Sequence, residues 1–262
     1  MLSRLLLLLP IRLLNNMTFD LSTAPLRYLT QREATAVDQE LFTDFSFSVD
    51  QLMELAGLSC ATALARAHPL AGLKNGGSVL VLTGPGNNGG DGMVCARHLQ
   101  QFGYRPTVYY PKESKNEIMI RLLQQMYKLD IPVLKEPSAF PSLQELNQSY
   151  DVLVDAFFGF SFKPPVREPF GSALAQIVES ITPIFSIDIP SGWDVESGPP
   201  NVPGVPVLKP QTLISLTAPK LCASYFSGRH FLGGRFVPTT IAEKYDLNLP
   251  SYSGTDCVIE LV

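Results

Sequence analysis

A short apolar run followed directly by glycine-rich chain is the strongest pattern in the sequence. Val79 to Leu82 are all apolar, as expected for a strand buried on both faces of a sheet. The segment 84–92 reads GPGNNGGDG, and apolar residues at helical spacing follow it up to Gly103. We predict a central strand, a glycine turn and a helix that begins at Asp91. Because glycine adopts positive φ readily, we expect the turn to use it and to direct backbone N–H groups towards an anionic ligand.

Strands and helices alternate through the rest of the chain. Apolar runs predict the strands, and apolar residues spaced three and four apart predict the helices between them. The expected strands cover 107–110, 131–134, 152–158, 184–189 and 213–216, and the expected helices cover 117–129, the region of 143–146, and 173–178. The proline-rich segment 199–210 is predicted to be a surface loop. This order is typical of right-handed βαβ units and predicts an α/β fold with a parallel sheet.

Helices are also expected before the central strand. Thr30 and Glu33 have the spacing of a capping box, and residues 34–41, with Asp38 among them, continue at helical spacing. A further helix is expected from about Ser48 to Pro69, where proline ends it. We expect both helices to pack against the sheet or to form a dimer contact.

The first sixteen residues, MLSRLLLLLPIRLLNN, differ from the rest of the chain. They carry Arg4 and Arg12 but no acidic residue, and a proline interrupts the leucines, so the segment is too short to span a membrane. Interleaved arginines favour a mitochondrial presequence over the alternative, a secretory signal built on Leu5 to Leu9. We therefore expect a targeting peptide or disordered segment over 1–27, followed by one domain over 28–262.

Charge and cysteine usage exclude several classes of protein. The formal net charge is −4, from 20 Lys and Arg against 24 Asp and Glu, which offers no general basic surface for nucleic acid. The cysteines are scattered and contain no C-x-x-C pair, which argues against a zinc knuckle or a disulfide scaffold. We expect free thiols at Cys60, Cys95, Cys222 and Cys257.

Polar side chains follow several of the predicted strands. Ligands of open α/β sheets bind beyond the carboxyl ends of the strands, so polar groups at those ends should converge on one site. Such groups can hold polar ligand atoms or a cation. The residues concerned are Asn87, Asn88 and Asp91 after the first strand, Asp155 and Lys163 after another, and Asp188 and Ser191 after a third.

The glycine segment also allows a dehydrogenase as an alternative. Gly84, Gly86 and Gly89 satisfy G-x-G-x-x-G, which between a strand and a helix is typical of a dinucleotide site. An NAD-dependent dehydrogenase needs an acidic residue about 20 positions further on for the ribose hydroxyls. The strand at 107–110 is followed instead by Pro111 and Lys112, which disfavours that alternative.

Several long segments, taken together, resemble one family. They are GPGNNGGDG (84–92), VDAFFGFSF (154–162), SIDIPSGWDVE (186–196), SLTAPK (215–220) and FLGGRFVP (231–238). In this order they are similar to the YjeF N-terminal domain of NAD(P)H-hydrate epimerases, whose animal members are also known as apolipoprotein A-I-binding proteins. The resemblance runs from about Tyr28 to the C-terminus, and the ending GTDCV (254–258) is similar to that of an animal paralogue. It implies a Rossmann-like three-layer α/β/α sandwich, a homodimer, and an isomerase that acts on hydrated NADH or NADPH in nicotinamide nucleotide repair.

The resemblance also implies roles for individual residues. A potassium ion would be held by Asn88, Asp155 and Ser191, whose oxygen atoms suit a hard cation. The substrate would be held by Asn87, Asn88, Gly89, Gly90 and Asp91, by Asp188, and by a loop of Gly159, Phe160, Ser161, Phe162, Lys163, Pro164 and Pro165. The family commonly has Gly-Asp after the loop lysine, so the two prolines here remove a carboxylate and two backbone donors.

The implied reaction follows ordinary hemiaminal chemistry. C6 of the hydrated nicotinamide bears a hydroxyl beside the ring nitrogen, whose lone pair expels that hydroxyl once it is protonated. Water that returns to the other face inverts the centre. We expect Asp188 to act as the acid and base, with Lys163 placing or polarising the water. The alternative function is a non-catalytic or dual-role protein that binds apolipoprotein A-I and regulates cholesterol efflux.

Overall fold

The structure, a computed structural model, describes residues 25–261. Most of the targeting peptide expected over 1–27 therefore lies outside the described residues. The described chain contains an eight-stranded sheet in the order β3-β2-β1-β4-β5-β6-β7-β8, with every neighbouring pair parallel except the antiparallel β7 and β8. The strands are β1 (Ser78–Thr83), β2 (Arg105–Tyr109), β3 (Val133–Leu134), β4 (Val152–Ala156), β5 (Ile184–Ile187), β6 (Thr212–Leu216), β7 (Arg229–Gly233) and β8 (Val258–Leu261).

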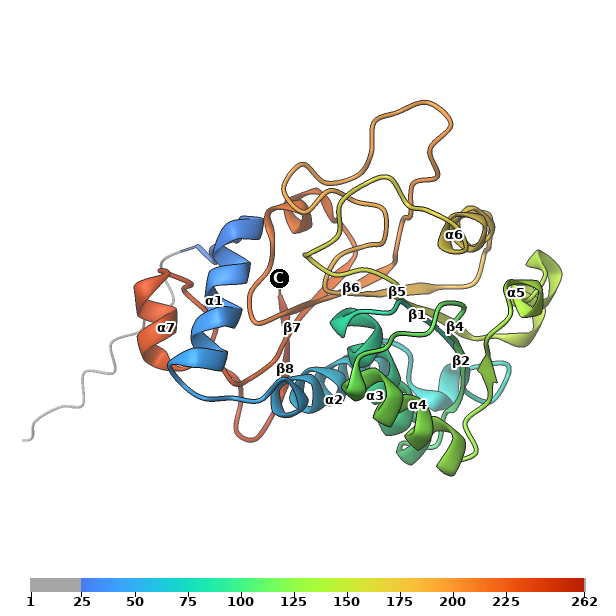
Figure 1. Cartoon of the computed structure of the whole chain (residues 1–262), viewed down its shortest axis with the longest axis horizontal. Helices are drawn as coiled ribbons and strands as arrows, with labels where there is room; N and C mark the ends of the chain where they lie inside the picture. The colour runs from blue at the N-terminus through green and yellow to red at the C-terminus, as the bar shows by residue number, and fades with distance from the viewer. Residues whose placement is uncertain (1–24, 262) are drawn as a thin grey trace, which may run out of the picture.

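Helices cover both faces of this sheet and make three layers (Figure 1). One face packs against α2, α3 and α4, and the other packs against α5 and α6. The helices are α1 (Gln31–Thr43), α2 (Val49–Ala67), α3 (Asn87–Gln101), α4 (Glu117–Lys128), α5 (Leu143–Ser149), α6 (Phe170–Val178) and α7 (Thr239–Lys244). The predicted Rossmann-like three-layer α/β/α sandwich with a mostly parallel sheet is confirmed.

Strand β1 shows why the apolar run is unbroken. Successive side chains of a strand point to opposite faces of the sheet. Val79 and Val81 accordingly join the core beneath α2, α3 and α4, whereas Leu80 and Leu82 join the core beneath α5 and α6. All four side chains are fully buried, so a polar residue at any of these positions would lose its contact with water.

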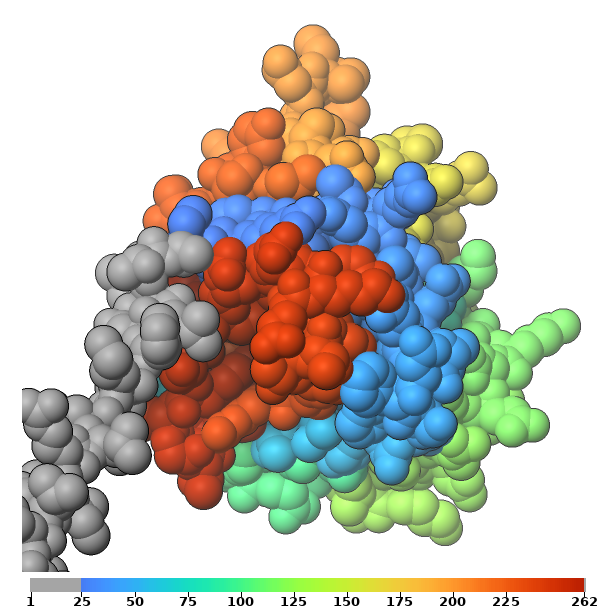
Figure 2. All heavy atoms as spheres, turned by 90° about the vertical axis from the view of Figure 1, so that its left-hand side faces the viewer, coloured from blue at the N-terminus to red at the C-terminus, as the bar shows by residue number. Residues whose placement is uncertain are grey.

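The two N-terminal helices begin where the sequence places them. Thr30 and Ser48 each accept a hydrogen bond from the third backbone N–H of their helix, and each completes a capping box. Helix α1 lies beside α7 near the C-terminal end of the described chain (Figure 2), where Glu40 accepts hydrogen bonds from Lys244 and Tyr245. Elements from the two ends of the chain thereby close one side of the fold.

Other boundaries differ from the prediction. The strand expected over 184–189 ends at Ile187, because Asp188 adopts a φ of 65° that strand geometry cannot include. The segment 152–158 also leaves the sheet early, after Ala156. Strands β7 and β8 and helix α7 were not predicted, since they are short and β7 and β8 mix apolar with charged residues.

Two further expectations can be compared with the described residues. The predicted loop 199–210 forms no helix or strand and projects from the body of the molecule (Figure 1). All four cysteines are free thiols, as expected. Within residues 25–261, no helix has the length and apolar character that crossing a membrane requires.

Candidate functional site

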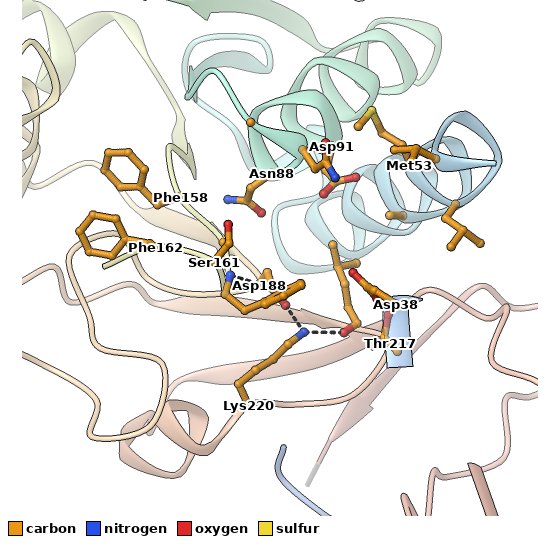
Figure 3. Close-up of a pocket in the computed structure, with 18 of the residues that line it drawn as sticks. Asp38, Met53, Asn88, Asp91, Phe158, Ser161, Phe162, Asp188, Thr217 and Lys220 are labelled. Atoms are coloured by element: carbon orange, nitrogen blue, oxygen red, sulfur yellow. Dashed lines mark hydrogen bonds and ion pairs between the residues drawn. The ribbon is translucent and has the colours of Figure 1, made fainter. Parts of the chain in front are cut away.

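A cavity of about 530 Å³ opens beyond the carboxyl ends of the central strands (Figure 3). This is the position at which open α/β sheets bind their ligands. Apolar side chains from α1 and α2 form one wall, and the start of α3 and the segment 157–162 form another. The polar and charged lining residues are Asp38, Asn87, Asn88, Asp91, Ser161, Asp188, Thr217 and Lys220.

The glycines before the cavity act through their small size, which corrects the prediction of a positive-φ turn. Helix α3 begins at Asn87 rather than at Asp91, and none of the glycines between 84 and 92 has positive φ. A Cβ atom on Gly84 would stand 1.9 Å from the carbonyl oxygen of Phe157, and one on Gly89 would stand 1.9 Å from that of Gly84. The glycines therefore let β1, α3 and the chain after β4 approach more closely than larger residues would permit.

A buried ion pair lies at the inner end of the cavity. Nζ of Lys220 is 2.5 Å from Oδ1 of Asp188, and the two side chains are 3% and 5% exposed. Nζ also donates to the carbonyl oxygen of Leu216 at 2.9 Å, and it lies over the ring of Phe160. A hydrogen bond between two charged groups is roughly twice as strong as one between neutral groups.

Backbone geometry fixes both partners of this pair. Asp188 is the central residue of a γ-turn, in which the N–H of Ile189 donates to the carbonyl of Ile187 at 2.8 Å. The backbone on both sides of Lys220 is fixed by Leu29. The N–H of Leu29 donates to the carbonyl of Pro219 at 2.8 Å, and the carbonyl of Leu29 accepts from the N–H of Leu221 at 2.9 Å. The segment before α1 therefore helps to position the lysine.

The neighbouring strand end repeats the same strained turn. Thr217 has a φ of 68°, and the N–H of Ala218 donates to Leu216 at 2.7 Å. Left-handed backbone at residues other than glycine costs about 1–3 kcal/mol and persists where the surroundings fix it. Two such turns on the adjacent strands β5 and β6, both lining the cavity, mark this edge of the sheet as the functional one.

The segment after β4 closes the cavity from the side. The N–H of Phe160 donates to Oδ2 of Asp188 at 3.3 Å, and the carbonyl of Phe160 accepts from Gln31 at 2.7 Å. Phe158 and Phe162 stack with ring centroids 4.5 Å apart (Figure 3). This segment therefore contacts both the ion pair and helix α1.

The three residues expected to hold potassium lie at the ends of three adjacent elements. Asp155 is fully buried and accepts from Ser186 Oγ and from the N–H of Ser191, both at 2.8 Å. Burial raises the pKa of Asp155, and the hydrogen bonds from Ser191 and Ser186 partly offset that effect. Ser191 Oγ accepts from the N–H of Phe158 at 3.3 Å, which joins this group to the cavity wall.

Asn88, the third residue expected to hold potassium, lines the cavity. Its side chain is 9% exposed, and its Nδ2 has no hydrogen-bond partner among the described residues. A buried N–H donor without a partner is costly, and it indicates a missing ligand that offers acceptor atoms. The amide oxygen of Asn88, the carboxylate of Asp155 and the hydroxyl of Ser191 are the kinds of oxygen donor that suit a hard cation. No group of three or more His, Cys, Asp or Glu residues that could hold a metal occurs in residues 25–261.

The residues predicted to bind the substrate divide into three groups. Asn87, Asn88, Asp91, Asp188, Gly159, Phe160, Ser161 and Phe162 all line the cavity. Gly89 and Gly90 are buried behind it, against Gly84 and Met53 respectively. Lys163, Pro164 and Pro165 are exposed and do not line the cavity, so the structure does not bring the loop lysine to Asp188.

The sequence argument missed two charged residues of the site. Lys220 belongs to the quoted segment SLTAPK, but no local pattern shows that it contacts Asp188. Asp38 stands among the apolar positions of α1, and a carboxylate on the buried side of a helix was the available signal. Both come from parts of the chain distant in sequence from the glycine segment.

The fold and the cavity define an α/β protein with a Rossmann-like sheet and a ligand pocket at its carboxyl edge. The chain belongs to the family described as YjeF-related protein N-terminus, which matches residues 49–222. It is similar to the crystal structure of yeast YNL200c, with 42% sequence identity and a TM-score of 0.84 over 90% of this chain and 100% of that chain.

More distant structures add no functional information. A match to the delta subunit of eIF2B from Chaetomium thermophilum has 12% identity and a TM-score of 0.35, over 60% of this chain and 54% of that chain. A match to the tetrameric eIF2B-beta2-delta2 complex from C. thermophilum has 11% identity and a TM-score of 0.33, over 53% and 42%. These values are too low to support any argument about this chain.

Proposed function

We propose that the protein is an isomerase that interconverts the R and S epimers of hydrated NADH and NADPH. Membership of the YjeF-related family supports this class of reaction. The observation that carries the proposal is the Asp188–Lys220 pair, which lies buried at the inner end of a cavity large enough to hold a nicotinamide ring. A buried acid and base at one point is what a hemiaminal carbon needs.

The reaction requires proton transfer and no hydride transfer. The C6 hydroxyl takes a proton from the Asp188–Lys220 pair and leaves as water, while the ring nitrogen lone pair forms a C=N bond. Water then adds to the other face of C6 and loses a proton, which restores a neutral hydrate of opposite configuration. The closeness of Nζ and Oδ1, at 2.5 Å, lets the pair release and recover that proton.

The nucleotide would enter past the start of α3. The N-terminus of a helix favours phosphate, and Asn87 and Asn88 stand there with side-chain amides. The role predicted for Lys163 stays a prediction, since placing that side chain near Asp188 requires the loop to move. Lys220 is the lysine that already contacts the carboxylate.

We propose potassium as the cofactor, held by Asn88, Asp155 and Ser191. The buried carboxylate of Asp155 and the oxygen donors that the other two side chains carry support this proposal. The ion would compensate the buried negative charge and fix the chain after β4, which contacts Asp188.

Replacement of Asp188 tests the proposed function. Asp188→Asn keeps the size of the side chain and removes its proton transfer, so interconversion of the epimers should fall by about 10²–10⁴-fold. Glu179→Gln, an exposed position at the end of α6, is the matched control and should keep full activity. Full activity of folded Asp188→Asn would refute the assignment. The homodimer, the apolipoprotein A-I partner and the mitochondrial or secreted location stay predictions.

A further inference from the structure

Three carboxyl groups and one ammonium group line the cavity. Asp38 from α1, Asp91 from α3 and Asp188 from the end of β5 all line it, together with Lys220 (Figure 3). In this view Asp188 and Asp38 lie on either side of the end of the Lys220 side chain. The proposed reaction, as described above, uses only Asp188 and Lys220.

Inversion at C6 makes a geometric demand that one carboxyl group does not meet. The hydroxyl leaves from one face of the ring, and water must add to the opposite face. A ring that fills a pocket cannot turn over between these steps, so a group on one wall serves one face only. Efficient interconversion in both directions therefore needs a second acid and base on another wall.

Asp38 meets this demand better than Asp91. In Figure 3 Asp91 lies near Met53 and away from the end of the Lys220 side chain, and burial, with the nearby charges of Asp188 and Asp38, raises the pKa of Asp91 well above its usual value. Burial also raises the pKa of Asp38, to about 6, with Lys220 opposing the rise and Asp188 adding to it. A carboxyl with that pKa gives and takes protons near neutral pH.

We propose that Asp38 is the second acid and base, an inference that rests on the proposed function. Asp38 serves the face of the nicotinamide ring opposite to the face that Asp188 serves. In one direction the Asp188–Lys220 pair gives a proton to the C6 hydroxyl and the C6–O bond breaks, which releases water and leaves a C=N bond. A water on the opposite face then forms the new C–O bond and gives a proton to Asp38. Before the next turnover in the same direction, Asp38 loses this proton to solvent water and the Asp188–Lys220 pair takes one up, so no other reactant is consumed.

Incorporation of oxygen from H₂¹⁸O tests this assignment. If each carboxyl serves one face, Asp38→Asn should lower epimer interconversion by at least about 100-fold while one epimer still exchanges its hydroxyl with retention of configuration. Asp188→Asn should preserve exchange in the other epimer. Asp44→Asn, at the exposed end of the same helix α1, is the matched control and should interconvert the epimers normally.

The outcomes separate this inference from the proposed function. If the unmodified protein does not interconvert the epimers, the proposed function fails. If the unmodified protein interconverts the epimers and Asp38→Asn does so within about threefold of the same rate, the role of Asp38 is overturned. It is also overturned if Asp38→Asn and Asp188→Asn preserve oxygen exchange in the same epimer, or in neither epimer. Circular dichroism verifies folding of each variant, and Asp38→Ser replaces Asp38→Asn if the latter does not fold.

Discussion

At the scale of single residues, the proposed chemistry and the stability of the site both involve the ion pair between Asp188 and Lys220. Both charges are almost completely removed from water, so each needs the other. The strained turn at Asp188 and the pairing of Leu29 beside Lys220 hold them together. The site therefore combines parts that sequence patterns describe with a contact that only the folded chain reveals.

Breaking the pair should cost much stability, and removing both charges should restore part of it. Lys220→Met leaves Asp188 buried without a partner and should lower the free energy of unfolding by about 3–5 kcal/mol at pH 7. The double variant Lys220→Met, Asp188→Asn should recover most of that loss. Urea unfolding of the unmodified protein and of these two variants measures the change, and a double variant no more stable than Lys220→Met would contradict the coupling.

Asp38 should reduce stability where it is charged. The folded protein binds the proton of Asp38 more tightly, with a pKa of about 6 against an ordinary 3.8, so stability falls as the pH rises between these values. Asp38→Asn should therefore raise the free energy of unfolding by about 1–3 kcal/mol at pH 7.5 and leave it unchanged at pH 3.5. Denaturant titrations at both pH values check this, and an equal change at both would be inconsistent with it.

At the scale of elements, the unit of β1 and α3 shows how far the pattern of the sequence reaches. The apolar run predicts β1 because every side chain in it is buried. The start of α3 was predicted four residues late, because glycine usually disfavours helices and the close contacts that require it are not visible in the sequence. Lys220 was missed for a similar reason, because its partner Asp188 lies 32 residues earlier in the chain and the contact forms only on folding.

Adding one methyl group at this junction should disrupt it. The Cβ of Gly89→Ala would overlap the carbonyl oxygen of Gly84, and backbone cannot move aside cheaply, so we expect a loss of about 3 kcal/mol or more. Gly72→Ala, where a Cβ meets nothing within 4 Å, should change stability by less than about 0.5 kcal/mol. Thermal unfolding compares the two variants, and equal melting temperatures would argue against close approach as the role of Gly89.

At the scale of the whole molecule, segments near both ends of the described chain contribute to the cavity at the carboxyl ends of the central strands. The family match covers residues 49–222, yet Asp38 and the segment around Leu29 lie before it. Helix α1, which carries Asp38, is held in place by α7 near the other end of the chain. A shortened chain that starts at residue 49 should therefore lose activity even if its sheet forms.

A bound potassium ion should stabilise the entire fold. An ion that binds only the folded protein adds about 2.7 kcal/mol at a concentration 100 times its dissociation constant. Replacing potassium with choline should therefore lower the melting temperature, and Asp155→Asn should abolish that dependence, whereas Glu179→Gln should retain it. A melting temperature that is the same in both salts would contradict the potassium site.

The most direct test follows pure epimers of hydrated NADPH by chromatography with the purified protein. Starting from either the R or the S epimer, the protein should produce the same final mixture much faster than buffer alone does. Asp188→Asn should bring the rate back near that of buffer. If folded protein leaves each epimer to convert at the uncatalysed rate, the cavity does not perform this reaction and the proposed isomerase is wrong.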